Sequence, residues 1–169
     1  MHVLRLLALA ALIALGGFVP VHAQDKASKV FGAWQVECDP SQGSKCVLAF
    51  ALVSAKDKKV AFAWSILPGK EKGTFSAVVR TLNGTLLPEG VVVTFAGQDP
   101  LRLAYRTCGP RFCFVEIPFT DSWLKAFKAQ KSFNVSYKAV DGKEVKHDVS
   151  LDKFTQAYDF FTANLAKAQ

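Results

Sequence analysis

Histidine is scarce in this chain of 169 residues, which contains only three. His2 and His22 lie in the N-terminal segment, so His147 is the only histidine that follows it. A Ser-His-Asp or Cys-His catalytic group would have to use His147, yet no Gly-x-Ser-x-Gly or His-Glu-x-x-His motif accompanies it. The sequence therefore predicts no catalytic residue and no cofactor, and His147 is expected to be a strand residue.

Long apolar runs are also missing, apart from one near the N-terminus. Residues 6–15 are apolar, Arg5 precedes them, and small residues follow up to Ala23. A membrane-spanning helix needs roughly 20 apolar residues, so this run is too short to be one. The pattern predicts a signal peptide over residues 1–23, cleaved after Ala23, and a single domain over residues 24–169, ordered from about residue 30. We therefore expect export to the periplasm or the outer surface, without a transmembrane segment in the mature chain.

Blocks of like charge are absent, although the chain is basic. Its net charge is +7, and loss of residues 1–23 would remove Arg5 and no acidic residue, leaving +6. The lysines stand singly or in pairs, without the runs of five or more that mark interaction tails. An exported basic protein meets lipid head groups, lipopolysaccharide, peptidoglycan or a host surface before it meets nucleic acid. We expect as partner an anionic envelope or host-surface component, or another envelope protein; the alternative is a solvated basic surface.

Cysteine is limited to four residues, Cys38, Cys46, Cys108 and Cys113, all after the predicted signal peptide. An even number in an exported protein predicts disulfides. Of the three possible pairings we favour Cys38–Cys46 and Cys108–Cys113, because the turn residues between each pair bring the cysteines close. Zinc would compete for them, but the spacing in the first pair is too long for a structural zinc site. A redox centre at Cys108 and Cys113 is a further alternative, although C-x4-C is longer than C-x-x-C.

Short stretches of alternating apolar and polar residues recur at roughly ten-residue spacing, which is typical of an all-β sandwich of seven to nine antiparallel strands. Turn residues such as Pro68-Gly69 and Asn83-Gly84 separate them. The predicted strands are 31–38, 46–53, 60–67, 74–80, 91–95, 101–107, 114–117, 133–137 and 145–149.

Two segments follow a helical period instead. Residues 120–129 begin with cap-type residues and place Trp123 and Phe127 four apart, which predicts a short internal helix docking two aromatic rings on the sheets. After Asp152, an apolar stripe of Phe154, Tyr158, Phe161 and Leu165 predicts a C-terminal amphipathic helix across the sandwich. A helix lying on a membrane surface is the alternative for the second segment.

The register of the last hairpin can be predicted from its two faces. A two-residue loop at Asp141-Gly142 would set Val135 against Asp148 on one face. A three-residue loop, 140–142, with Gly142 in the left-handed conformation instead pairs apolar positions with one another. The sequence therefore predicts the pairs Tyr137–Val145, Val135–His147 and Phe133–Val149.

The sequence also suggests one candidate binding surface. Arg102 and Arg106 share a strand face opposite Leu101, Leu103 and Tyr105, while Arg111 and Phe112 lie on the turn between Cys108 and Cys113. A disulfide-clamped turn presenting an arginine and an aromatic ring suits phosphates, carboxylates or an acidic partner. A solvated strand face is the alternative.

An ordered set of motifs across the mature chain resembles the invasion-associated locus B family of exported bacterial proteins. The motifs are Phe31-x-x-Trp34-x-Val36-x-Cys38 with Cys46, Leu86-Leu87-Pro88-x-Gly90-Val91, Cys108-x4-Cys113, and Val149-Ser150-Leu151-x-x-Phe154-x-x-Ala157. The resemblance implies an immunoglobulin-like β-sandwich in the periplasm or at the outer surface, without enzymatic activity. The family is named after a member linked to the entry of a pathogen into red blood cells.

Lys153 departs from the family pattern, which would have a glycine before Phe154, and 81–85 is a loose version of the segment that precedes Leu86. From residues and resemblance together, we expect an exported interaction module that associates with a host cell. A thiol-disulfide redox protein and a structural envelope protein without a dedicated ligand are the alternatives.

Overall fold

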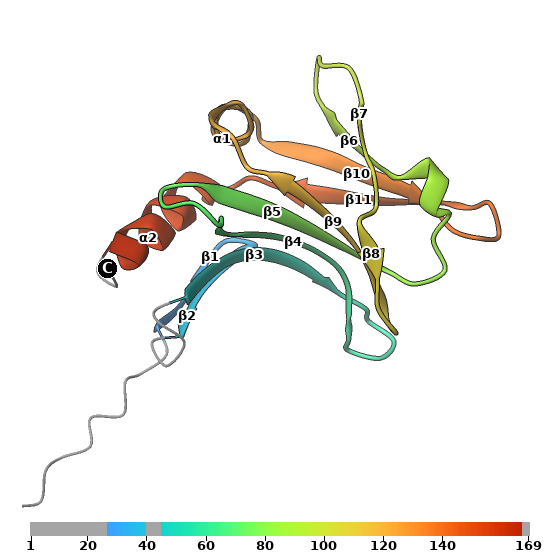
Figure 1. Cartoon of the computed structure of the whole chain (residues 1–169), viewed down its shortest axis with the longest axis horizontal. Helices are drawn as coiled ribbons and strands as arrows, with labels where there is room; N and C mark the ends of the chain where they lie inside the picture. Colours follow the sequence, from blue (N-terminus) through green and yellow to red (C-terminus); the bar gives the residue numbers. More distant parts are fainter. Residues whose placement is uncertain (1–26, 40–44, 167–169) are drawn as a thin grey trace, which may run out of the picture.

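Two antiparallel sheets pack face to face in the computed structural model of the chain, which describes residues 27–39 and 45–166. Figure 1 shows the larger sheet as an arch, with the smaller sheet along its convex side. This arrangement is the predicted β-sandwich, although the described residues form eleven strands where seven to nine were expected. The predicted signal peptide, its cleavage position and the turn at 40–44 lie outside the described residues.

The larger sheet has seven strands in the order β1-β2-β3-β4-β5-β9-β8. Their bounds are Ala27–Phe31 (β1), Trp34–Asp39 (β2), Lys45–Val53 (β3), Val60–Pro68 (β4), Phe75–Leu82 (β5), Phe112–Pro118 (β9) and Thr107–Cys108 (β8). The smaller sheet has four strands in the order β11-β10-β6-β7. These are Glu144–Ser150 (β11), Ser132–Lys138 (β10), Val91–Phe95 (β6) and Leu101–Leu103 (β7). A short 3-10 helix, Leu87–Glu89, precedes β6.

The alternation in the sequence explains the core. Every second residue of β2, including Trp34 and Val36, is buried on the inner face of the larger sheet, and the residues between them are exposed. The same pattern in β10 buries Phe133 and Val135. The indole N–H of Trp34 donates to the carbonyl oxygen of Ser150 at 2.7 Å, which ties β2 to the end of β11.

Both predicted helices are present and cover the part of the larger sheet that the smaller sheet leaves open. Helix α1 spans Asp121–Ala129 and buries Phe127, whose ring lies 5.6 Å from Trp64. Helix α2 spans Phe154–Ala166 and packs on β1, β2 and β3. Its buried residues Phe154, Tyr158 and Phe161 belong to the predicted stripe, so α2 lies against the sandwich. Within the described part of the chain, neither helix is long and apolar enough to span a bilayer.

The first disulfide and the last hairpin match the predictions. Cys38 lies directly opposite Cys46 in the β2–β3 pair, and the disulfide between them has Cα atoms 4.0 Å apart. In the β10–β11 pair, Tyr137 faces Val145, Val135 faces His147 and Phe133 faces Val149. Gly142 has φ of 81°, in the left-handed region that favours glycine.

Two predicted strands are wrong in their extent. Order was expected from about residue 30 and a strand over 31–38, but Ala27–Phe31 already forms β1 and pairs with β2. Gly32, with φ of 60°, opens a two-residue turn between them, a turn whose first position favours glycine.

The stretch 101–107 is not one strand. Leu101–Leu103 pairs with β6 in the smaller sheet, and Thr107–Cys108 pairs with β9 in the larger one. The three residues between them carry the chain from one sheet to the other. Leu101, which was expected in the core, is 47% exposed because β7 is an edge strand, whereas Leu103 is buried.

Lys153 reaches α2 through an unusual backbone conformation. Its φ is 59°, in the left-handed region, where a residue with a side chain costs about 1 kcal/mol relative to glycine. The resemblance implied a glycine at this position, and the backbone gives the physical reason.

Candidate functional site

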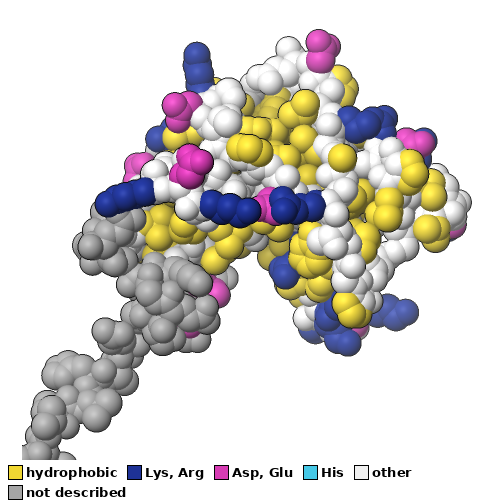
Figure 2. Space-filling view, in the orientation of Figure 1, with side chains coloured by type: hydrophobic (Ala, Val, Ile, Leu, Met, Phe, Trp, Pro, Cys, Tyr) yellow, Lys and Arg dark blue, Asp and Glu magenta, His cyan; other side chains and the backbone are white. Residues whose placement is uncertain are grey.

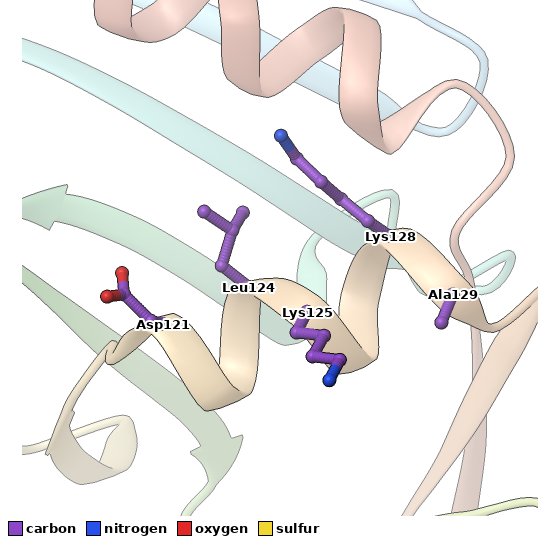
Figure 3. Close-up of a pocket in the computed structure, with 5 residues that line it drawn as sticks. All are labelled: Asp121, Leu124, Lys125, Lys128 and Ala129. Carbon is purple, nitrogen blue, oxygen red and sulfur yellow. The ribbon is translucent and has the colours of Figure 1, made fainter.

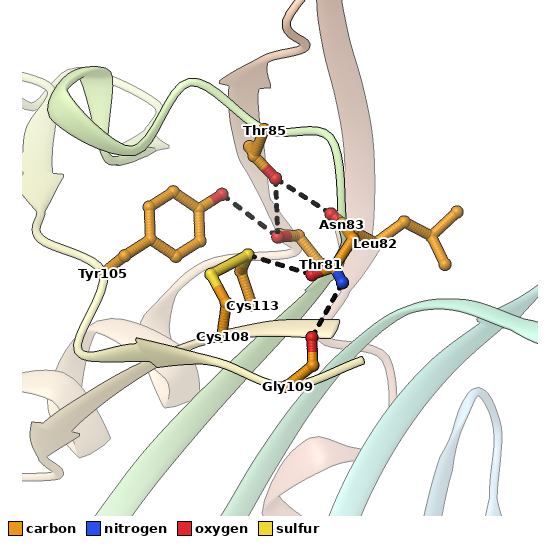
Figure 4. The surroundings of a disulfide bond; sticks show 8 residues. All are labelled: Thr81, Leu82, Asn83, Thr85, Tyr105, Cys108, Gly109 and Cys113. Carbon is orange, nitrogen blue, oxygen red and sulfur yellow. Dashed lines mark hydrogen bonds between the residues drawn. A yellow bond between two sulfur atoms is a disulfide. The ribbon is translucent and has the colours of Figure 1, made fainter. Parts of the chain in front are cut away.

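The turn at Cys108–Cys113, which we call the tip, lies at the edge of the larger sheet (Figure 4). The predicted disulfide is present: Cys108 lies directly opposite Cys113, with Cα atoms 4.0 Å apart. The Gly109 N–H donates to the carbonyl oxygen of Phe112 at 2.8 Å. Since β8 has only two residues, the disulfide and this bond define the turn.

Asn83 holds the tip from the neighbouring strand. Its backbone N–H donates to the carbonyl oxygen of Arg111 at 2.9 Å, and its side-chain N–H donates to that of Gly109 at 2.7 Å. Its amide oxygen lies 3.3 Å from the sulfur of Cys113. One asparagine therefore contacts three residues of the tip (Figure 4).

Hydroxyl groups lie behind the disulfide, on the side facing the smaller sheet. Thr81, which is fully buried, lies opposite Cys113 in the sheet, and its oxygen is 3.1 Å from the hydroxyl of Tyr105 and 3.5 Å from that of Thr85. Thr85 in turn donates to the carbonyl oxygen of Leu82 at 2.9 Å. Burial raises the pKa of Tyr105, against the opposing effect of the threonine hydrogen bonds. The back of the tip is thus a set of neutral, mutually hydrogen-bonded side chains.

The front of the tip carries two guanidinium groups on one aromatic ring. The guanidinium carbon of Arg111 lies 5.0 Å from the centre of the Phe112 ring, and that of Arg80 lies 4.9 Å from the same centre. Such contacts are attractive, because the face of an aromatic ring is electronegative. Among the described residues, neither arginine has a carboxylate within 4.0 Å. A cationic surface on a clamped turn can bind an anionic group.

The structure brings Arg111 and Phe112 together, but it gives the other two predicted arginines different surroundings. Arg102 lies in the smaller sheet and contacts Glu89 through both its carbonyl oxygen and its carboxylate, the latter at 3.2 Å. Arg106 stays near the tip and forms an ion pair with Glu116 at 3.0 Å. The charge of each is therefore partly balanced.

Sequence reasoning missed Arg80 and the loop between β3 and β4, residues 54–59. Arg111 donates to the carbonyl oxygen of Val60, 3.4 Å away, which places this loop beside the tip. The loop holds Lys56, Lys58 and Lys59, all exposed, with Asp57 as its one acidic residue. Figure 2 shows lysine and arginine side chains gathered at this end of the molecule. We call the tip together with this loop the basic end.

No sequence signal links these parts, because the pairing across β3, β4, β5 and β9 joins segments far apart in the chain. The alternation of β5 did place Arg80 on the outer face of the sheet. Only the observed register sets it next to the tip.

His147 is half-buried, as a strand residue opposite Val135. Its ring centre lies 4.7 Å from that of Phe62, and its Nε2 lies 3.4 Å from the hydroxyl of Tyr137. Burial lowers the pKa of His147, and burial, with a smaller effect of Tyr105, raises the pKa of Tyr137 to about 12. In the described ranges, no three residues of the metal-ligating types cluster.

Several hollows lie elsewhere on the described surface, and one of them is lined by residues 68–75, Thr162 and Leu165. Two more lie at α1 and at the smaller sheet. One, of about 500 Å³, lies along α1 and is lined by Asp121, Leu124, Lys125, Lys128 and Ala129 (Figure 3). The other, of about 440 Å³, lies on the outer face of the smaller sheet, where Asn134 and Lys146 are among its lining residues. Neither brings an arginine and an aromatic ring together as the tip does.

The redox alternative depends on the two sulfurs of the tip. A catalytic disulfide normally offers an accessible sulfur with a depressed pKa, for example at the start of a helix. Cys113 is only 3% exposed, whereas Cys108 is exposed, and helix α1 begins well beyond both cysteines, at Asp121. This geometry suits a structural clamp better than an exchange site.

Comparisons with known proteins are informative at the level of family and fold. The profile of the "Invasion associated locus B (IalB) protein" family matches residues 34–162. A crystal structure of invasion associated protein b from Bartonella henselae is similar with a TM-score of 0.68 at 21% identity, covering 81% of this chain and 96% of that one. No curated protein sequence matches the chain.

Proposed function

Because the chain belongs to the invasion-associated locus B family, we propose that it is an exported interaction module that binds an anionic partner through its basic end. The observation that supports this most directly is the pair of arginines, Arg80 and Arg111, on the ring of Phe112, without a carboxylate partner in the described chain. The partner is an anionic component of the bacterial envelope or of a host surface. Association with a host cell is the role that the family name suggests.

The form of the tip supports binding in addition to its charge. Arginine and aromatic side chains contribute most when they are held in place before binding, since less conformational entropy is then lost. The disulfide, Asn83 and the bond from Arg111 to Val60 all restrain this turn.

Export is part of this proposal. Two disulfides and the predicted signal peptide support an oxidising compartment outside the cytoplasm. Expression of the full chain in a bacterium, followed by periplasmic extraction and mass spectrometry, should give a protein that begins at Gln24. Retention of residues 1–23 in a cytoplasmic fraction would contradict it.

The test of binding uses purified oxidised protein, a bacterial envelope fraction and washed red-cell membranes. The variant Lys58→Ser/Lys59→Ser/Arg111→Ser should lose most of the binding to at least one of the two materials. Arg102→Ser is the matched control, since Arg102 is exposed but already contacts Glu89, and it should bind like the wild type. Equal binding by the triple variant and the wild type, or no binding by the wild type, would contradict the proposal.

A further inference from the structure

Arg80 lies outside the tip, on a part of the surface that the tip residues do not form. It stands on β5, in the interior of the larger sheet, and its side chain is half-buried on the outer face. Its Nε is buried and has no hydrogen-bond partner among the described residues. An unpaired buried donor costs about 1–3 kcal/mol, so the fold holds this arginine in place at a cost in stability.

The sheet register surrounds Arg80 with apolar side chains. Ala63 lies opposite it on β4 and Phe114 on β9, while Ala51 continues the same row on β3. Phe112 packs against Phe114 with ring centres 6.5 Å apart. The guanidinium therefore projects from a floor of small residues beside a wall of two aromatic rings.

This floor is the concave side of the larger sheet. Figure 1 shows the arch of the strands, and Figure 2 shows hydrophobic side chains lining the hollow beneath it. Several apolar residues remain exposed at its borders, with Val30 at 64%, Val53 at 56% and Leu82 at 39%. These residues lie on β1, β3 and β5, so exposed apolar side chains occur on three strands of the sheet.

We propose that Arg80 binds a side-chain carboxylate of an extended acidic segment of a partner protein, which lies in this hollow with its apolar residues against the floor. The proposal rests on the proposed function and names the partner's class. A carboxylate on an aliphatic stem can reach a recessed guanidinium and form two parallel hydrogen bonds with it.

The charges of the face favour a protein segment over a lipid surface. Glu116 lies on the same outer face as Arg80, one row along, and its ion pair with Arg106 adds no net charge to the face, so the face holds too few free cations for a dense array of phosphates. Arg106 is held by Glu116, which leaves Arg80 and Arg111 as the available cations of the face. A flat bilayer cannot enter a concave surface, whereas a single extended chain with alternating apolar and acidic residues matches it.

The test measures binding of a short peptide of alternating glutamate and valine to the purified oxidised protein, by calorimetry or fluorescence. Arg80→Leu should weaken binding about tenfold or more, as expected for loss of a paired guanidinium. The matched control Arg102→Leu should change it little. A peptide with glutamine in place of glutamate should bind the wild type as weakly as the original peptide binds Arg80→Leu.

Measuring both peptides with both the wild type and Arg80→Leu shows whether Arg80 contacts the carboxylate directly or affects binding indirectly. If Arg80 meets the carboxylate, Arg80→Leu should cause no further loss with the glutamine peptide. A second variant, Ala51→Gln, fills the exposed part of the floor with a neutral side chain and should also weaken peptide binding. Unfolding curves for each variant identify those that fail to fold.

Failure of this proposal is distinguishable from failure of the proposed function. If the triple variant of the basic end loses envelope or red-cell binding while Arg80→Leu binds the peptide normally, the carboxylate site is wrong and the proposed function stands. If Arg80→Leu instead loses binding to phosphatidylglycerol vesicles while peptide binding is absent, the ligand is a lipid surface and the proposal is overturned.

Discussion

The two disulfide hairpins have the same local geometry but very different surroundings. In each, the cysteines lie directly opposite one another with Cα atoms 4.0 Å apart. Cys38–Cys46 joins two interior strands of the larger sheet, and both of its cysteines are buried. Cys108–Cys113 joins a two-residue edge strand to its neighbour, and Cys108 is exposed.

The comparison indicates that one type of bond serves two purposes. In the first hairpin, neighbouring strands and α2 already hold the chain, so the bond adds to the stability of the whole fold. In the second, at the sheet edge, the bond acts together with Asn83 and the Arg111–Val60 hydrogen bond to fix the position of Arg111 and Phe112. Four experiments can separate these two purposes.

The largest expected effect on stability comes from the first hairpin. Cys38→Ala/Cys46→Ala should lower the free energy of unfolding by about 3–4 kcal/mol, from lost loop constraint and lost buried sulfur contacts. Urea denaturation measures the loss. At a temperature where the variant is still folded, its binding to the envelope fraction or red-cell membranes should be unchanged. Lost binding at that temperature would show that the first disulfide is also needed for binding.

For the second hairpin, we expect a smaller loss of stability and a larger loss of binding than for the first. The Cys108–Cys113 disulfide closes a shorter loop, so Cys108→Ala/Cys113→Ala should lower the free energy of unfolding by about 2 kcal/mol. Its binding to the same material should nevertheless fall, because the tip becomes free to move and ordering it on binding costs entropy. Both quantities come from the urea denaturation and membrane-binding measurements used for the first pair. Wild-type binding by this variant would show that the clamp has no role in presentation.

Asn83 sharpens the comparison without removing a covalent bond. Asn83→Ala deletes the side-chain hydrogen bond to Gly109 and should cost about 1 kcal/mol. Hydrogen exchange of the Gly109 amide should become faster, since its bond to Phe112 lies within the loosened turn. Asn134→Ala, on the outer face of the smaller sheet, is the control and should leave this exchange rate unchanged. An unchanged rate in Asn83→Ala would mean that the disulfide alone orders the tip.

The smallest expected effect on stability comes from His147, the half-buried histidine of β11. Burial lowers the pKa of His147, so below pH about 6.5 the unfolded chain takes up a proton before the folded one does. Stability should therefore fall as the pH drops below that value and level off below the folded pKa. His147→Gln should remove this dependence in urea denaturation at pH 7.5 and pH 5. The depressed carboxyl groups of Asp57, Asp141 and Glu144 act only at lower pH, since their contributions are lost below about pH 4.

Features that depend on neighbouring residues in the sequence could be predicted. The two disulfides, the last hairpin and both helices each follow from a local pattern of turn residues, alternation or helical spacing. For the last hairpin, the faces of two adjacent strands sufficed to give the register. The turn at Gly32 carried such a signal as well, but the apolar alternation from Phe31 to Cys38 concealed it.

Features that depend on long-range register could not be predicted. Residues 101–107 alternate like one strand, because alternation does not record which sheet a strand joins. Arg80 and Arg111 are neighbours only because β5 pairs with β9, although β6 and β7 intervene in the chain and lie in the other sheet. The candidate site was therefore predicted in part, with Arg102 in place of Arg80.

The cysteines pair in sequence order, Cys38 with Cys46 and Cys108 with Cys113, at separations of 8 and 5 residues. If the chain enters an oxidising compartment N-terminus first, Cys46 follows Cys38 long before Cys108 arrives. An oxidant that joins cysteines in their order of arrival would then produce the native connectivity directly. A route of this kind would require no reshuffling of mispaired sulfurs by an isomerase.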